Sequence, residues 1–357
     1  MNRQSASAIN QVTGLREGTF ALARLQEDER IFVALVRPAG EVVDLSSRFP
    51  SLNELYRDWP RAFDELQRIE RTAASTGKAF HEYRALAPVE KPQIFCAGSN
   101  YRQHAAEMYT FNEGNYQKER HRGETDEQFY QRNLSFVVEK RAKGMPFIWL
   151  ASHGSLVGPE DDIELPFVGV AHDWEAELGV VVAGGAPRYL TPEEAGAYIV
   201  GYTVVNDMHT GELFSRDDIK WNADWIAKQQ PTFKQAGPFV VPRQFFPERD
   251  SLHIKLDVSG ERMQDWPADD MIFSPEEYLS YASERLPLLA GDLLMMGSPP
   301  GNGAVHGGRW LQAGDTVEIE ITGLGRQRHT VVAEDAGGRT PFWGLPPLDT
   351  PSTQGAR

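Results

Sequence analysis

The sequence contains a single cysteine, Cys96, among its 357 residues. One cysteine excludes an intrachain disulfide framework and any zinc site that is built from several thiolates. Cys96 lies in the apolar run from Ile94 to Ala97, which predicts a buried side chain that serves as a small hydrophobic residue.

Long apolar runs and an excess of positive charge are also absent. No uninterrupted apolar stretch could span a bilayer, and the first eight residues lack the apolar core of a signal peptide, so we expect a cytoplasmic protein without a membrane partner. The chain carries 36 basic and 51 acidic residues, a net charge of −15, and no long basic run. Nucleic acid is therefore not an expected partner, and an anionic substrate would need a local cation to hold it.

A hydrophobic content of 41% over this length predicts one large domain and a smaller one. A polar N-terminus and a tail rich in Pro, Ser and Thr from Pro346 onward predict disordered ends. The predicted parts are a disordered N-terminus (1–17), a small α/β domain (18–90), a catalytic domain (93–334) with an insertion (109–145), and a C-terminal tail (335–357).

Secondary-structure signals give the fold class. The small domain should contain a hairpin over residues 19–37 and a helix over 51–76 that is broken at Pro60. In the large domain short strand-like runs and glycine-rich turns dominate, and two helix starts carry an N-cap, a proline and a capping glutamate, Thr191 to Glu194 and Ser274 to Glu277. This pattern predicts a β-rich α+β fold. The polar insertion is either a mobile flap or a helical lid.

Two carboxylates stand one residue apart in a strongly β-forming run, Glu175 and Glu177, and Asp207 ends a second apolar run. Because side chains alternate faces along a strand, Glu175 and Glu177 must point the same way. They would repel each other unless water or a cation neutralised them, and three hard oxygen ligands suit Mg²⁺, Mn²⁺ or Ca²⁺. The ordinary alternative is a solvated strand face.

A second candidate lies near the start of the large domain. If the segment from Ser99 is helical, His104 and Glu107 share one face, and a carboxylate beside an imidazole makes it a better proton acceptor. The alternative is an exposed helical turn with a routine pair. Lys228 lies among apolar and turn residues, where the alternative is a surface cation. The run 291–301 reads as a strand that ends in a loop of small residues, whose amides could approach a ligand.

Taken in this order, these segments resemble the fumarylacetoacetate hydrolase family. The similarity runs from about Gln93 to Val332, and it rests on seven ordered motifs, each weak alone. The motifs are Gly98-Ser-Asn-Tyr with His104 and Glu107, Gly158-Pro159 with Ile163 to Pro166, Glu175-Ala-Glu177-Leu, Gly201 to Asp207, Lys228 with Phe233 and Gly237-Pro238, Gly291-Asp292 with Gly297 to Gly301, and Leu311 to Glu320.

The resemblance implies a mixed β-roll catalytic domain, a homodimer, a small-molecule substrate and one divalent metal ion, Mg²⁺ before Mn²⁺ or Ca²⁺. It implies three metal ligands, a lid dyad that activates water, and one substrate-facing cation. In that order, these are Glu175, Glu177 and Asp207; His104 and Glu107; and Lys228. Further substrate-binding candidates are Tyr101, His153, Gly297 and Ser298.

The chain departs from the family pattern at two cations. Ala151, with His153 nearby, stands where many members have a lysine, and Gly211 stands where many have an arginine that helps hold carboxylate-bearing substrates. The resemblance implies a hydrolase that cleaves a carbon–carbon bond in a 1,3-dicarbonyl or acylpyruvate-like compound, in the catabolism of an aromatic or related carbon source. The alternatives are a decarboxylase, hydratase or isomerase of a 2-oxo acid on the same metal site, and a non-catalytic ligand-binding relative.

Overall fold

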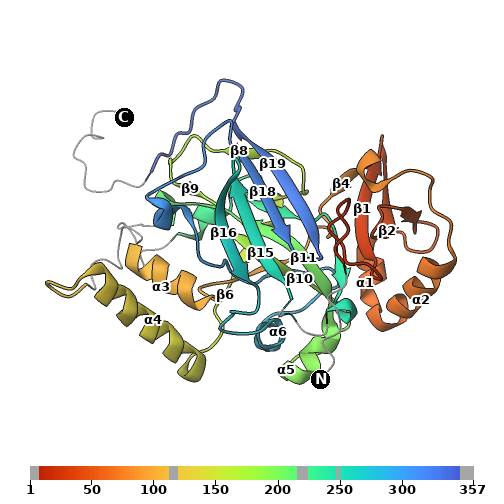
Figure 1. Ribbon diagram of the computed structural model, residues 1–357, viewed down its shortest axis with the longest axis horizontal. Helices are drawn as coiled ribbons and strands as arrows, with labels where there is room; N and C mark the ends of the chain where they lie inside the picture. The colour runs from red at the N-terminus through yellow and green to blue at the C-terminus, as the bar shows by residue number, and fades with distance from the viewer. Residues whose placement is uncertain (1–7, 112–119, 215–223, 247–248, 250, 346–357) are drawn as a thin grey trace.

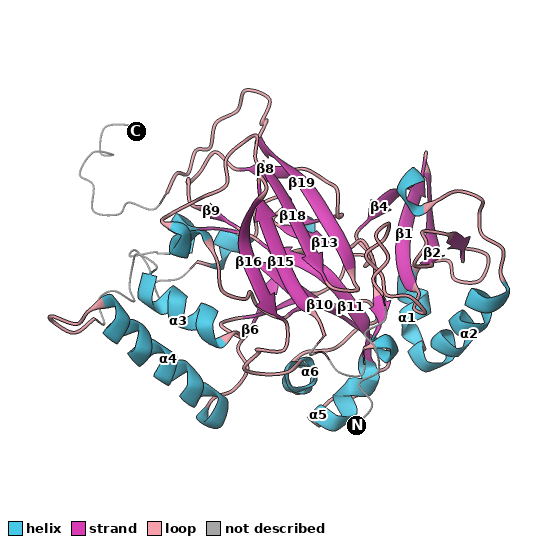
Figure 2. Ribbon diagram, in the orientation of Figure 1, coloured by secondary structure: helices cyan, strands magenta, loops and turns pink. Residues whose placement is uncertain are grey.

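The structure is a computed structural model that describes residues 8–111, 120–214, 224–246, 249 and 251–345. Within these residues the strands form a four-stranded, an eight-stranded and a five-stranded sheet together with a two-stranded ladder (Figure 1). The four-stranded sheet and its two helices form a separate lobe, at the right of the view, beside the larger sheets (Figures 1 and 2). The fold is α+β and rich in strands, as the sequence predicts.

The N-terminal lobe follows the sequence pattern closely. β1 and β2 pair antiparallel as the predicted hairpin. The predicted helix is interrupted at Asp58, and Pro60 lies in the first turn of the second helix, where its missing N–H leaves no hydrogen bond unmade. The elements of this lobe are β1 (Ala21–Glu27), β2 (Arg30–Val36), β3 (Val42–Asp44), β4 (Arg84–Leu86), α1 (Leu52–Arg57) and α2 (Trp59–Thr72).

The expectation that residues 1–17 are disordered is wrong for residues 8–17. Leu15 is completely buried and bridges to Gly323 and Leu324, and the Thr13 hydroxyl donates to the Pro38 carbonyl at 2.7 Å. The burial of one leucine and a satisfied hydroxyl hold this polar stretch against the body of the protein. Residues 1–7, and the tail from Pro346 that was predicted to be disordered, lie outside the described residues.

The eight-stranded sheet contains the longest buried strands, β10 and β11, which pair antiparallel at its centre. Gly179 of β10 is required for this close pairing, because a Cβ there would lie 2.7 Å from side-chain atoms of Thr203 and Val205. The strand order is β6 (Ile148–Ala151), β5 (Ile94–Ala97), β17 (Leu293–Met295), β10 (Ala176–Val182), β11 (Ile199–Asp207), β13 (Lys234–Ala236) and β7 (Leu156–Val157), and β14 (Val241–Pro242) pairs with β11.

The two faces of β10 and β11 are buried in different ways. Leu178 and Val180 pack with Ile254 and Val317 of the five-stranded sheet, whereas Val181 packs on the opposite face in a cluster that reaches the N-terminal lobe. Glu177 shares the face of Val181, because alternate residues of a strand point the same way. The five-stranded sheet has the order β16 (Glu261–Pro267), β15 (His253–Val258), β18 (Thr316–Ile321), β19 (Gly325–Ala333) and β8 (Ile163–Leu165).

The helices of the larger part of the molecule pack in pairs, α3 with α4 and α5 with α6. Both predicted capping boxes are present, at Thr191 before α5 and at Ser274 before α6. The predicted insertion contains a helix, α4, which packs on α3 and joins it through a bond of 3.0 Å between Asn133 and Thr110. No helix in the described ranges is long and apolar enough to cross a membrane. The bounds are α3 (Arg102–Phe111), α4 (Asp126–Lys143), α5 (Pro192–Ala195) and α6 (Pro275–Ser283).

Short elements complete the chain. The two-stranded ladder lies just before β10 and just after β11 in the sequence, so it extends their pairing. Its strands are β9 (His172–Asp173) and β12 (His209–Thr210). The 3₁₀ turns are η1 (Phe80–Glu82), η3 (His153–Ser155), η4 (Gly196–Tyr198), η5 (Gly211–Phe214), η6 (Trp225–Lys228), η7 (Arg243–Phe245) and η8 (Gly303–His306).

Candidate metal centre

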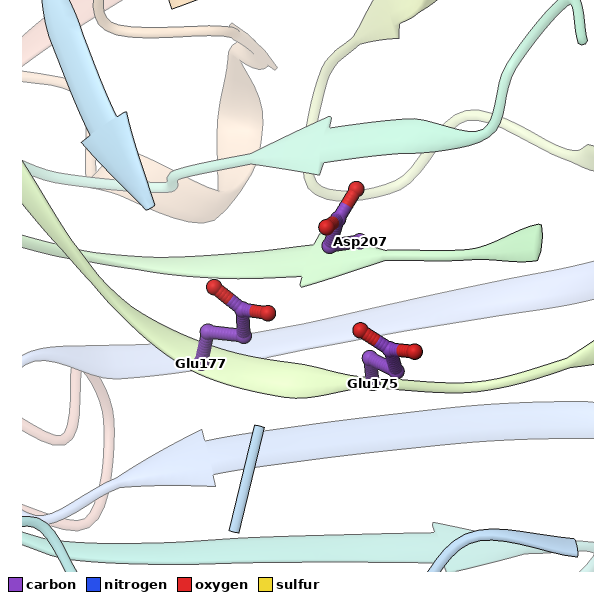
Figure 3. Close-up of side chains that lie close together, drawn as sticks. All are labelled: Glu175, Glu177 and Asp207. Atoms are coloured by element: carbon purple, nitrogen blue, oxygen red, sulfur yellow. The ribbon is translucent and has the colours of Figure 1, made fainter. Parts of the chain in front are cut away.

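Three acidic side chains meet where β10 begins and β11 ends (Figure 3). The Asp207 amide donates to the Glu175 carbonyl at 2.9 Å, and the Glu175 amide donates to the Asn206 side chain at 2.9 Å, so the backbone fixes both strand ends. One carboxylate oxygen each of Glu175, Glu177 and Asp207 lie within 4.8 Å of one another. These side chains are buried, which makes their mutual repulsion costly without a cation. The structure thus brings together the three acids predicted as metal ligands.

Two lysines and a histidine surround the acids. Lys228 Nζ lies 2.6 Å from Glu175 Oε2 and 2.9 Å from Asp207 Oδ2. Lys234 Nζ lies 2.7 Å from Asp207 Oδ1. His209 Nδ1 lies 3.0 Å from Glu175 Oε1. The role predicted for Lys228 was substrate-facing; its charged contacts here are with the acids.

Lys234 and His209 were missed by the sequence analysis. Lys234 is the direct cross-strand neighbour of Asp207 in the β11–β13 ladder, a relation that the sequence does not display. His209 follows Asp207 by two residues, and this spacing is the one signal that could have suggested it.

Burial and the neighbouring charged groups shift the pKa values of Glu175 and Glu177 in opposite directions. Burial raises the pKa of Glu177 well above its usual range, and the charges of Asp207 and Glu175 raise it further. Burial would also raise the pKa of Glu175, but Lys228 and His209 outweigh it and hold that pKa below its usual range. Despite burial, the carboxylates of Asp207 and Glu175 raise the pKa of Lys228 above its usual value.

Among the described residues, Glu177 is the acid of the triad without a counter-ion. Its Oε2 accepts from the Gly297 amide at 2.7 Å, but no lysine, arginine or histidine in the described part of the chain pairs with it. A buried carboxylate of this kind is neutral or is bound to a cation. Three hard oxygen donors with one uncompensated charge therefore fit a divalent ion such as Mg²⁺, Mn²⁺ or Ca²⁺.

The predicted lid residues both lie on α3, but they do not form a hydrogen-bonded pair in the described structure. Glu107 Oε1 accepts from the Gln103 amide at 2.9 Å, and its Oε2 accepts from the Gly301 backbone amide at 3.4 Å. The Nδ1 atom of His104 is buried and has no hydrogen-bond partner among the described residues. Burial lowers the pKa of His104 to about 4, so the imidazole is neutral at pH 7 and can accept a proton.

The four substrate-binding candidates lie in different surroundings. Gly297 reaches the acids through its amide and has a φ of 89°, a backbone conformation that favours glycine. Ser298 follows it in the same loop, and its hydroxyl accepts from the Gln264 side chain at 2.9 Å. Tyr101 is buried and donates to the Ala268 carbonyl at 3.2 Å, a structural contact. His153 is exposed on η3 and makes no described hydrogen bond or ion pair with the acids.

Aromatic side chains lie beside the basic residues of the site. Trp149 stacks on Trp225 with ring centroids 5.1 Å apart, and Trp225 also contacts Phe147 at 5.7 Å and Phe214 at 5.8 Å. We call these four residues the aromatic wall. Lys228 Nζ lies 5.7 Å from the Trp149 ring centroid, and His209 lies 5.1 Å from the Phe214 ring centroid. The wall therefore adjoins the acids on the side of Lys228 and His209.

Comparison with known proteins gives the evolutionary context. Residues 93–332 match the family model described as fumarylacetoacetate (FAA) hydrolase C-terminal. A 2,4-didehydro-3-deoxy-L-rhamnonate hydrolase from Sphingomonas sp. (strain SKA58) is 35% identical over 188 residues, which is 52% of this chain and 65% of that protein. A mitochondrial oxaloacetate tautomerase from Bos taurus is 28% identical over 292 residues, which is 80% of this chain and 82% of that protein.

Solved structures share the fold at low sequence identity. A maleylpyruvate hydrolase from Sphingobium sp. SYK-6, in complex with manganese (II) ion and pyruvate, superposes with a TM-score of 0.65 at 20% identity and covers 88% of this chain and 100% of its own. A 2-hydroxyhepta-2,4-diene-1,7-dioate isomerase from Mycobacterium marinum has a TM-score of 0.60 at 23% identity, covering 88% and 99%. The family model spans well over half of the sequence, so the chain belongs to the fumarylacetoacetate hydrolase family.

Proposed function

We propose that this protein is a metal-dependent hydrolase that cleaves a carbon–carbon bond in a 1,3-dicarbonyl or acylpyruvate-like compound. The observation that carries the proposal is the buried acidic triad, in which Glu177 has no counter-ion among the described residues. The same protein holds a neutral His104, whose Nδ1 atom has no hydrogen-bond partner among those residues. With an acylpyruvate the balanced reaction consumes one water and yields pyruvate and a carboxylic acid, so the site must hold an oxo acid and activate a water.

A divalent ion held by Glu175, Glu177 and Asp207, with Mg²⁺ the first candidate, would polarise the substrate carbonyls and stabilise negative charge on their oxygens. His104 takes the proton of the attacking water, because it is neutral at pH 7 and its Nδ1 atom has no hydrogen-bond partner among the described residues. Glu107 fixes α3 against the loop at Gly301 and so positions His104. Lys228 adds positive charge beside the reacting oxygens.

The activities of the relatives support alternative reactions at the same acidic site. Among the proteins similar to this chain are a tautomerase and an isomerase as well as hydrolases. These reactions share enolate chemistry and differ in whether a water attacks, and a decarboxylase or hydratase would use the same site. The neutral His104 favours hydrolysis, because it provides a base for that water.

The test is to supply the purified protein with a simple acylpyruvate and Mg²⁺ or Mn²⁺ and to identify the products. We expect pyruvate and the carboxylic acid in equal amounts, and loss of this turnover when EDTA removes the metal. Keto–enol exchange without cleavage would assign a tautomerase, and release of CO₂ a decarboxylase. Saturable binding without any product would assign a non-catalytic relative. Turnover that persists in EDTA would contradict the scheme.

We further propose that the part of the substrate remote from its oxo-acid end is apolar. Neither Ala151 nor Gly211 supplies the cation that many family members use for a substrate carboxylate, whereas the aromatic wall lies beside Lys228. Trp225 is 38% exposed and Phe147 45% exposed, so both offer surface to a ligand. Buried contact with aromatic rings favours an aryl or alkyl group over a second carboxylate.

This proposal predicts a preference that can be measured. An acylpyruvate with a phenyl group at its remote end should have a kcat/KM at least about tenfold above one that ends in a carboxylate, and Trp225→Ala should remove about tenfold from the phenyl compound alone. Trp343→Ala is the matched control, because Trp343 is 82% exposed in the C-terminal segment. An equal preference for both substrates would contradict the assignment.

The homodimer, the cytoplasmic location and the catabolic role stay predictions. Size-exclusion chromatography with light scattering tests the first of them directly.

A further inference from the structure

Lys234 is a buried cation that the proposed reaction does not use. Its side chain has no exposed surface, and its Nζ lies 2.7 Å from Asp207 Oδ1. The remaining donors of the ammonium point at backbone, since Nζ lies 2.5 Å from the Lys228 carbonyl and 3.3 Å from the Phe233 carbonyl. A lysine is rarely buried completely, because removal of its charge from water is costly. The carboxylate of Asp207 and the two carbonyls that the ammonium contacts must therefore stabilise the charge of Lys234.

The two lysines pair with two of the three acids, Glu175 and Asp207. Lys228 lies between Glu175 Oε2 and Asp207 Oδ2, whereas Lys234 contacts Asp207 Oδ1. Both oxygens of Asp207 are therefore paired with an ammonium. Within the described part of the chain the cluster holds three carboxylates and two ammonium groups, so fewer negative charges are available to an incoming ion than the three acids alone would offer.

The placement of Lys234 is fixed by the sheet. Asp207 and Lys234 are paired residues in the antiparallel β11–β13 ladder, so the two side chains leave directly opposite positions of buried strands. A fixed positive charge next to a ligand oxygen repels a divalent cation, and this repulsion is strong where water is excluded. The same charge stabilises the acids when no metal is bound.

We propose that Lys234 is a built-in counter-ion of the acidic triad, which weakens the affinity of the site for a divalent cation and keeps the metal-free site stable. This inference rests on the proposed metal-binding role of Glu175, Glu177 and Asp207. It makes the metal an exchangeable component of the folded protein.

A purely structural role and a counter-ion role for Lys234 predict opposite changes in metal affinity when the lysine is removed. If Lys234 only braces the strand, its loss distorts Asp207 and weakens metal binding. If it opposes the metal, its loss frees Asp207 Oδ1, removes a repulsive charge and tightens binding. Affinity for the metal alone therefore discriminates between the two roles without a substrate.

The experiment compares the wild type with Lys234→Met, which keeps the approximate length and volume and removes the charge. Isothermal titration of the metal-free proteins with MnCl₂ should give a Kd at least about tenfold lower for the variant. The melting temperature of the metal-free variant should fall, and the rise on adding Mn²⁺ should exceed that of the wild type. Lys255→Met is the matched control, because Lys255 is a partly exposed lysine on β15 and should behave as the wild type.

An unchanged or weaker affinity for Mn²⁺ in Lys234→Met would overturn the proposal. Lys234→Gln, which keeps a polar side chain, provides a second neutral variant and should also tighten binding. Failure of both variants to fold even with Mn²⁺ present would assign Lys234 a structural role and likewise overturn it. A wild type that binds no divalent cation would instead contradict the metal site itself, so the two failures are distinguishable.

Discussion

Glu177→Gln is expected to abolish binding of the divalent cation and to reduce turnover at least about a thousandfold. Glu177 is the one triad acid without a cation partner among the described residues, and a neutral amide of the same shape cannot supply the negative charge that a metal needs. Isothermal titration with Mg²⁺ and Mn²⁺ measures the binding, and product formation from an acylpyruvate measures turnover. Glu320→Gln, on the exposed face of β18, is the matched control.

Loss of activity in this variant should not arise from unfolding. Burial and the neighbouring acids raise the pKa of Glu177 in the folded protein. Its stabilising contribution is therefore complete below the ordinary pKa and is lost as the pH rises through the folded pKa. At pH 7 the metal-free variant should be at least as stable as the wild type in urea denaturation. A less stable variant would mean that Glu177 has a structural partner.

His104→Gln is expected to reduce turnover about a hundred- to ten-thousandfold while the Kd for the metal stays within about twofold of the wild type. His104 is buried on α3, outside the acidic triad, and it is the proposed base. Substrate turnover and metal titration on the same sample separate these two effects. His81→Gln is the matched control, since His81 is exposed on η1 in the N-terminal lobe. Equal losses of activity in both variants would contradict the role of His104 as the base.

His104→Gln should also change how the free energy of unfolding depends on pH below 6.5. The folded pKa of His104 is lowered to about 4 from 6.5 by burial, so the unfolded chain takes up its proton first as the pH falls. The contribution of His104 to the free energy of unfolding should therefore be constant above pH 6.5 and decrease between pH 6.5 and 4, by about 3 kcal/mol at the acid end. His104→Gln should lack this decrease. Urea denaturation at pH 7, 5 and 4 measures it, and equal slopes in both proteins would contradict the burial of a neutral imidazole.

Local sequence determined much of the fold. The capping boxes at Thr191 and Ser274 start helices as predicted, because an N-cap, a proline and a glutamate satisfy the first amides of a helix within four residues. The strand runs at β10 and β11 are likewise predicted, since runs of apolar and β-branched residues are local properties. The common direction of the Glu175 and Glu177 side chains follows from the two-residue alternation of an extended chain alone.

The surroundings of the acids could not be predicted in this way. No local pattern places Lys234 opposite Asp207, because that contact depends on which strands pair and in which register. The predicted dyad of His104 and Glu107 is a case in which the local spacing permits a contact that the tertiary structure does not form. The spacing of His104 and Glu107 permits contact on one helix, but Gln103 and the distant Gly301 amide take the carboxylate instead.

Local patterns were sufficient to predict most elements, the family resemblance and the three acids that we propose as metal ligands. The spacing of Glu175 and Glu177 places both side chains on one face of a strand. The charges around these acids depend instead on tertiary contacts. Lys228, Lys234 and His209 meet Glu175 and Asp207 through strand pairing and a 3₁₀ turn, over separations of up to 53 residues. Electrostatic interactions depend on distance and burial, and neither is a property of neighbouring residues in the sequence.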